Sequence, residues 1–123
     1  MKKEFSKRHY QIGESIKRTL SKIFMEGKFE HKIKDLFSVV EVVPSRGFES
    51  AVVYISAIDA SKNKELVQKL NEITSEIRYE LANNSELRST PTLIFKLDTT
   101  LDYAQRIEDI LNSDEVKKDL ENL

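Results

Sequence analysis

The fold is decided by residues 87–98, whose sequence is LRSTPTLIFKLD. A helical pattern runs into this stretch without a glycine break, and Pro91 disfavours helix at Thr90. Residues 92–97 then form an alternating apolar pattern, which predicts a strand. A helix that leads through a proline into a strand, after an earlier helix and hairpin, gives the element order α-β-β-α-β.

Two β-branched stretches earlier in the chain predict an antiparallel hairpin. The first covers residues 37–43 and the second covers residues 48–58, with the sequence Pro44-Ser45-Arg46-Gly47 between them. Proline cannot donate to a strand ladder, and Gly47 accepts a positive φ, so these four residues predict the turn.

Stripes of apolar residues at helical spacing predict the helices. The first helix is expected at about residues 7–26, with Ser6 as its N-cap and Gly27 as its stop. The second stripe predicts one long helix over roughly residues 62–83, and a last stripe predicts a C-terminal amphipathic helix from Leu101 to Leu111. The stretch between the first helix and the hairpin is polar and charged, which is typical of a connecting loop.

Length and composition fit one small domain. The chain has 123 residues, of which 39% are hydrophobic and 33% charged, and it contains no cysteine. We expect a single domain over residues 1–112 and an acidic, frayed tail over residues 113–123. No apolar run approaches the ~20 residues that a membrane span needs, so no membrane contact is expected. Without cysteines and without an apolar stretch after the basic N-terminus, a cytoplasmic protein is expected, and without an unpaired heptad or a large exposed apolar stripe, a monomer is expected.

Positive and negative charge are unevenly distributed along the chain. Residues 1–34 hold ten Lys or Arg against four Glu, a net charge of +6, whereas residues 98–123 hold three basic against eight acidic residues, a net charge of −5. Such asymmetry is typical of a protein with a polyanionic partner. A solvated helix face would look the same, so charge alone leaves both interpretations open.

The chain lacks the residue patterns of an active site. His9 and His31 sit in polar surroundings without a second ligand at metal spacing, which favours surface histidines. The three glycines are isolated from one another, and close packing on the sheet would explain Gly13, which costs ~1 kcal/mol relative to alanine in a helix. Without a convergent acid, base or nucleophile, we expect no enzyme, no cofactor, no metal and no small-molecule substrate.

These motifs together resemble the ribosome-binding factor A family over about residues 4–111. The likeness lies in the basic start Lys3-Glu4-Phe5 with Lys7-Arg8, in the Ile12, Ile16, Leu20 and Ile23 spacing, in the hairpin sequence VEVVPSR leading into AVVYIS, and in Ile77-Arg78 followed by Leu87-Arg88-x-x-Pro91-x-Leu93-x-Phe95-x-x-Asp98. The resemblance implies an α+β, KH-like fold of type II, in the order α-β-β-α(kinked)-β plus a C-terminal helix. Its helices would pack on one face of a three-stranded sheet.

The resemblance also implies a function. It suggests a non-catalytic assembly factor that binds the immature small (30S) ribosomal subunit and its 16S rRNA. Such a factor supports late maturation and 5′-end processing of the rRNA, especially at low temperature. The alternative is an adaptor that docks on proteins through its acidic C-terminal helix and never touches RNA.

The chain departs from the family pattern at three places. The family interrupts its second helix with an Ala-x-Gly kink, but the matching positions are Ile73-Thr74-Ser75. From the residues alone nothing breaks the helix there, so the kink would need a different backbone solution or would be shallower. Gln11 stands where a family arginine is expected, and Gly47-Phe48 stands where an acidic-aliphatic pair is usual.

RNA contact is expected from basic side chains, because lysine and arginine neutralise phosphates. The candidate phosphate contacts are Lys2, Lys3, Lys7, Arg8, Lys17, Arg18 and Lys22, with Arg46, Thr74, Ser75, Arg78 and Arg88 as supporting candidates.

Simple surface roles compete with these assignments. Arg78 could pair with Glu76 or Glu80, and Arg88 could pair with Glu86. Three aromatic residues could either stack on bases or pack against the first helix: Phe5, Tyr10 and Phe29.

Overall fold

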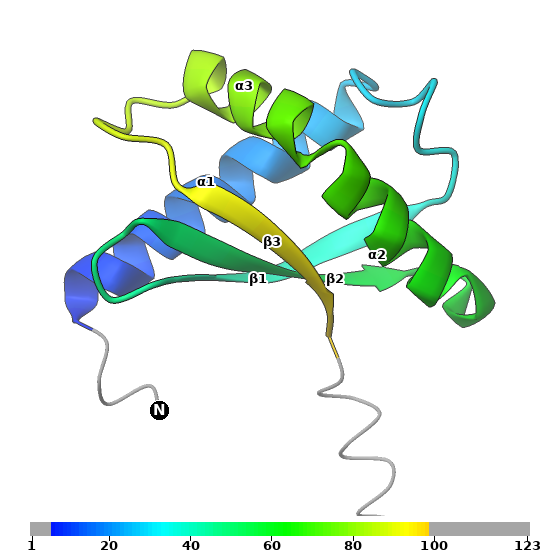
Figure 1. Ribbon diagram of the computed structural model, residues 1–123, viewed down its shortest axis with the longest axis horizontal. Coiled ribbons are helices and arrows are strands. Elements are labelled where there is room, and N and C mark those ends of the chain that lie inside the picture. Colours follow the sequence, from blue (N-terminus) through cyan, green and yellow to red (C-terminus); the bar gives the residue numbers. More distant parts are fainter. Residues whose placement is uncertain (1–5, 99–123) are drawn as a thin grey trace, which may run out of the picture.

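The computed structural model describes residues 6–98, which form an α+β domain with its helices along one face of a sheet (Figure 1). The elements are α1 (Lys7–Met25), β1 (Phe37–Pro44), β2 (Ser50–Ala57), the 3₁₀ turn η2 (Ala60–Lys62), α2 (Asn63–Glu72), α3 (Thr74–Asn84) and β3 (Thr92–Leu97). This order confirms the predicted one. The expected C-terminal helix and the acidic tail lie outside the described residues.

The three strands form one sheet in the order β1-β2-β3. β1 and β2 pair antiparallel, as the hairpin pattern predicted, and β2 and β3 pair parallel. Val53 in the central strand faces Val42 on one side and Phe95 on the other. A register shift between Val39 and Glu41 marks a bulge in β1. β3 is an edge strand, so one side of its backbone needs partners other than a strand.

The turn between β1 and β2 differs from its prediction. The amide of Phe48 donates to the carbonyl of Ser45 over 3.0 Å, which closes the turn. The residue with a positive φ in this turn is Phe48, at 62°, and not Gly47. The expectation that Gly47 would supply the positive φ was therefore wrong. A bulky aromatic residue in the left-handed region is uncommon and indicates a local constraint.

α1 begins and ends as predicted, and it lies close to the sheet. Ser6 is its N-cap, and Gly27, at φ 76°, follows its last turn. A Cβ atom on Gly13 would overlap the carbonyl oxygen of Val42 in β1 and would lie 3.3 Å from Cδ of Pro44. The close packing expected at Gly13 is therefore confirmed.

The core lies between the helices and the sheet. Its most buried members are Ile16, Leu20, Ile23, Ala51, Val53, Ile55, Leu66, Leu70, Ile77, Leu81, Leu93 and Phe95. Phe29 and Ile33 from the segment after α1 are also buried, although this segment was expected to be a polar loop. Phe29 packs against Phe24 with ring centroids 6.0 Å apart.

The long second helix is interrupted at Ile73, whose φ of −107° and ψ of 18° separate α2 from α3. Figure 1 shows the two helices meeting at an angle. The expectation of one continuous helix was wrong, and the kink that the family resemblance implied is present. Its physical cause lies in β3, whose outward-facing backbone groups bind side chains beside the break.

Two side chains make these bonds to β3. Asn71 donates from Nδ2 to the carbonyl of Phe95 over 3.0 Å and accepts the Phe95 amide at Oδ1 over 2.9 Å. The hydroxyl of Thr74 donates to the carbonyl of Leu93 over 3.1 Å. The spacing of apolar residues carries no information about these hydrogen bonds, so it did not predict the break in the helix.

Candidate RNA-binding surface

The solvent side of α1 carries a row of cations, which we call the basic face of α1. It consists of Lys7, Arg8, Lys17, Arg18 and Lys22. All are exposed except Lys17, which is half-buried. Lys22 lies 4.0 Å from Glu26, and the other four form no ion pair with any residue between 6 and 98.

Helix stability does not explain the two cations at the start of α1. The first turn of α1 contains no acidic residue and holds Lys7 and Arg8. A helix N-terminus carries partial positive charge, which disfavours each nearby cation by about 0.3–1 kcal/mol. Ser6 accepts the backbone amide of His9 and so caps the helix without adding negative charge. The end of the helix is therefore strongly positive, as an anionic partner requires.

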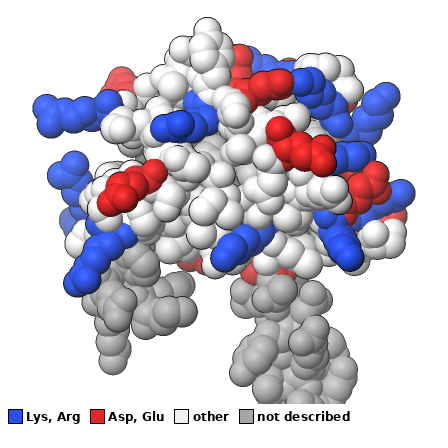
Figure 2. All heavy atoms as spheres, in the orientation of Figure 1, with Lys and Arg blue, Asp and Glu red and all other residues white. Residues whose placement is uncertain are grey.

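Two further candidate arginines lie in loops on the side of the domain where α1 begins (Figure 1). Arg46 is in the β1–β2 turn and Arg88 in the α3–β3 loop, and both are exposed. The carbonyl of Arg46 lies 3.0 Å from Nε2 of His9, and the amide of Thr92 donates to the carbonyl of Glu49 over 3.0 Å. These bonds hold the turn against α1 and bring the end of the α3–β3 loop to the turn. In Figure 1 the start of α1, the β1–β2 turn and the α3–β3 loop all lie on the left side of the domain, where Figure 2 shows Lys and Arg side chains.

Of the three candidate residues around the helix break, two already use their side chains in hydrogen bonds within the domain. Arg78 donates from Nη2 to the carbonyl of Thr90 over 2.7 Å and from Nε to the carbonyl of Pro91 over 3.1 Å. Thr74 uses its hydroxyl on β3. Ser75 is exposed and, within the described part of the chain, its hydroxyl makes no hydrogen bond. Arg78 and Thr74 thus have structural roles, and any RNA contact would be additional.

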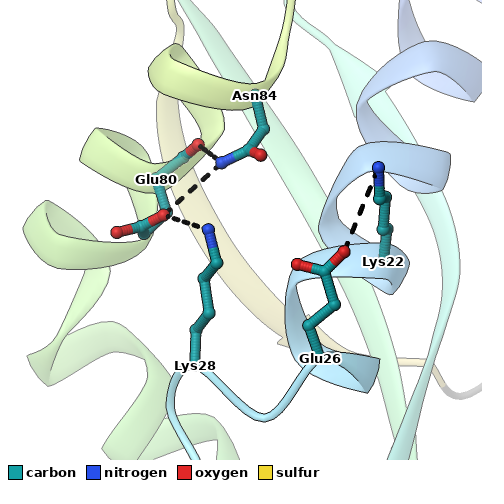
Figure 3. A network of polar contacts seen from close by, with 5 residues as sticks. All are labelled: Lys22, Glu26, Lys28, Glu80 and Asn84. Atoms are coloured by element: carbon teal, nitrogen blue, oxygen red, sulfur yellow. Dashed lines mark hydrogen bonds and ion pairs between the residues drawn. The ribbon is translucent and has the colours of Figure 1, made fainter.

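The acidic residues of α3 pair with lysines and not with arginines. Lys28 Nζ lies 2.9 Å from Glu80, and Lys32 Nζ lies 2.6 Å from Glu76. Figure 3 shows Lys28 reaching Glu80, to whose backbone carbonyl Asn84 also donates. The hydrogen bond to Glu80 raises the pKa of Lys28. These two lysines are neutralised locally, in contrast to Lys7, Arg8, Lys17 and Arg18 on the basic face of α1.

The two arginines that could have formed ion pairs with nearby glutamates do not form them in the part of the chain that the structure describes. Arg88 does not pair with Glu86 within the described chain, and Arg78 pairs with neither Glu76 nor Glu80. Tyr10 is 69% exposed, whereas Phe29 is buried. Three of the candidates lie outside the described residues: Lys2, Lys3 and Phe5.

Sequence reasoning missed the contact of His9 with Phe48. Their rings stack with centroids 4.3 Å apart and planes inclined by 20°. Arg8 places its guanidinium carbon 5.5 Å from the centroid of the Phe48 ring. The one signal in the sequence was the unusual Gly47-Phe48 pair in the turn.

Residues 6–98 contain neither a candidate metal site nor a helix that could span a membrane. No group of three or more His, Cys, Asp or Glu residues is placed to hold a metal ion there. No helix in that range is long and apolar enough to cross a membrane.

The chain is similar in sequence to proteins of one known family. A family model described as ribosome-binding factor A matches residues 8–111. Ribosome-binding factor A of Caldicellulosiruptor bescii is 34% identical over 121 residues, which cover 92% of this chain and 88% of the relative. The same factor of Paramagnetospirillum magneticum is 29% identical over 119 residues, which cover 95% and 84%.

Solved structures agree with the fold. The crystal structure of ribosome-binding factor A from Thermus thermophilus aligns with a TM-score of 0.62 at 19% identity, covering 72% of this chain and 93% of that one. A homology model of the Thermus thermophilus factor, fitted into a cryo-EM map of a 30S–RbfA complex, aligns with a TM-score of 0.58 at 19% identity, covering 73% and 94%.

The fold defines a KH-like α+β domain, as expected. The family match makes it a non-catalytic binding protein and confirms that it is not an enzyme. The chain belongs to the ribosome-binding factor A family.

Proposed function

We propose that this chain is an assembly factor that binds the immature small (30S) ribosomal subunit through its 16S rRNA. It supports late maturation and 5′-end processing of that rRNA, with the greatest need at low temperature, and it acts in the cytoplasm as a monomer. Family membership supports this proposal, as does the 30S–RbfA complex named for the Thermus thermophilus relative. The observation that carries it is the set of four cations on α1, Lys7, Arg8, Lys17 and Arg18, that form no ion pair within the described residues.

Phosphate neutralisation is the proposed source of affinity. Each lysine or arginine that meets a phosphate releases condensed counterions, which makes binding favourable at low salt and weaker at high salt. The basic face of α1 would follow the rRNA backbone, with Arg46 and Arg88 contacting it beyond the start of the helix. Lys2 and Lys3 would extend this contact, and Thr74, Ser75 and Arg78 would approach it at the helix break. The binding domain would comprise residues 1–112, followed by the acidic tail.

The salt dependence of binding tests the mechanism. A variant with Lys7, Arg8, Lys17 and Arg18 changed to glutamine removes four candidate phosphate contacts. The slope of log affinity against log salt should then become shallower by roughly 3, because each contact contributes 0.7–0.9 to it. Binding to immature small subunits is measured across a salt series for wild type and variant.

A matched control changes the same amount of charge elsewhere. Lys34, Lys62, Lys64 and Lys96 are exposed and form no ion pair within the described residues. Their replacement by glutamine gives the same net charge and should change the slope much less. Equal slopes for the two quadruple variants would contradict the proposal. If the α1 variant bound as well as wild type while removal of residues 99–123 abolished binding, the adaptor function would hold instead.

A further inference from the structure

The first turn of α1 is fastened to the β1–β2 turn through one histidine. His9 stacks on Phe48, and its Nε2 lies 3.0 Å from the carbonyl of Arg46. On the other side of the ring, Nδ1 accepts the backbone amide of Ser6 over 3.3 Å, which leaves the proton on Nε2 to donate to Arg46. The two segments are 37 residues apart in the chain, so this contact is tertiary and not a property of the helix alone.

The conformation of Phe48 indicates that this contact is built in. Within residues 6–98, Phe48 is the only residue other than glycine with a positive φ. A bulky side chain in this region is strained and persists only where its surroundings hold it. The neighbouring Gly47 would adopt a positive φ without strain but does not, so the strain is placed on the residue whose ring meets His9.

Both segments joined by this contact carry an arginine. Arg8 lies over the Phe48 ring at 5.5 Å, and Arg46 is fixed by its carbonyl two residues before Phe48. Neither arginine has an acidic partner within the described residues. The Arg8 side chain is held over the ring, and the backbone that carries Arg46 is fixed beside it, so less freedom is lost when the two arginines meet phosphates, which increases affinity.

We propose that His9 and Phe48 are positioning residues, which hold Arg8 and Arg46 together as a pair that contacts the RNA backbone. This inference rests on the proposed function. Without the stack, the β1–β2 turn would separate from α1, and each arginine would reach RNA independently. The charge of the protein would be unchanged, but its affinity would fall.

The variant Phe48→Gly tests the proposal. Glycine suits the positive φ, so the domain should keep its thermal stability while the stack is lost. Affinity for a 16S rRNA transcript should fall roughly 2- to 10-fold, the effect of releasing an ordered side chain. His9→Ala should cause a similar loss, and the two changes together should cause no more than either alone. Unchanged affinity in both single variants would overturn the proposal.

A double-mutant cycle separates positioning from a general structural effect. In a background with Arg8→Gln and Arg46→Gln, Phe48→Gly should have no further effect on affinity, because no arginine pair remains to be held. An equal loss in both backgrounds would show that Phe48 acts through the fold, and the inference would fail. If wild-type protein did not bind the transcript, the proposed function itself would fail, so the two failures are distinguishable.

Discussion

Asn71 is expected to stabilise the domain by closing the free edge of β3. Its amide makes two hydrogen bonds, to the carbonyl and to the amide of Phe95, at 3.0 and 2.9 Å. Phe95 is 1% exposed, so its backbone has limited access to replacement water. The variant Asn71→Ala removes both partners and keeps the rest of the side-chain packing nearly intact.

The two hydrogen bonds of Asn71 determine the expected loss in the free energy of unfolding. Each hydrogen bond contributes about 1 kcal/mol net, so the pair contributes about 2 kcal/mol. Alanine has a better helix propensity than asparagine, which recovers at most about 0.6 kcal/mol at the end of α2. The free energy of unfolding should therefore fall by roughly 1.5 kcal/mol, and the melting temperature by roughly 6 °C.

Urea denaturation measures the free energy, and hydrogen exchange of the Phe95 amide reports on the bond itself. The matched control is Asn83→Ala on α3, because Asn83 is exposed and its side chain forms no hydrogen bond within the described chain. The control should be neutral or slightly stabilising. If Asn71→Ala were as stable as the control and the Phe95 amide stayed protected, the edge-closing role would be refuted.

Two other changes test the packing of α1 and the start of the second helical segment. Gly13→Ala should destabilise the domain by about 1–2 kcal/mol, because the added Cβ would overlap the Val42 carbonyl oxygen. This loss should exceed the gain from the better helix propensity of alanine. A variant that was more stable in urea denaturation would show that α1 can move away from β1. Asp59 accepts the hydroxyl and the amide of Ser61, which lowers its pKa from the ordinary value of 3.8. A lowered folded-state pKa gives stability that is present above the ordinary value of 3.8 and lost as pH falls through the folded value. Asp59→Asn should therefore be less stable than wild type at neutral pH, and the difference should shrink as the solution is acidified; a difference that stayed constant with pH would contradict this.

The strands could be predicted from the sequence because their signals are local. Residues 92–97 were predicted as the third strand, and the structure has β3 at Thr92–Leu97. Alternation of side chains between a buried and an exposed face acts on each strand wherever it pairs. The same holds for the start of α1 at Ser6, since a cap needs only the amides that follow it.

Other features could not be predicted because their causes lie far away in the chain. The break at Ile73 depends on β3, about twenty residues later. The positive φ of Phe48 occurs where its ring stacks on His9, a partner 39 positions earlier in the chain that the local turn sequence does not reveal. Phe29 and Ile33 lie in a charged segment without helical or strand period, and they are buried because they pack into the core of the folded domain, Phe29 against Phe24 of α1.

The break in the second helix also explains the distribution of charge on the surface. Ile73 has a backbone conformation that an ordinary residue can adopt, so the kink needs no glycine once Asn71 and Thr74 bind the edge of β3. Because the chain turns there, α2 packs against β3 and β2 while α3 packs against α1 (Figure 1). An unbroken helix would carry α3 away from α1 and from the segment that follows it. The carboxylates of α3 would then be unable to neutralise Lys28 and Lys32, as they do here. The same bend that completes the core therefore neutralises two cations beside α3, whereas Lys7, Arg8, Lys17 and Arg18 on α1 form no ion pair within the described residues.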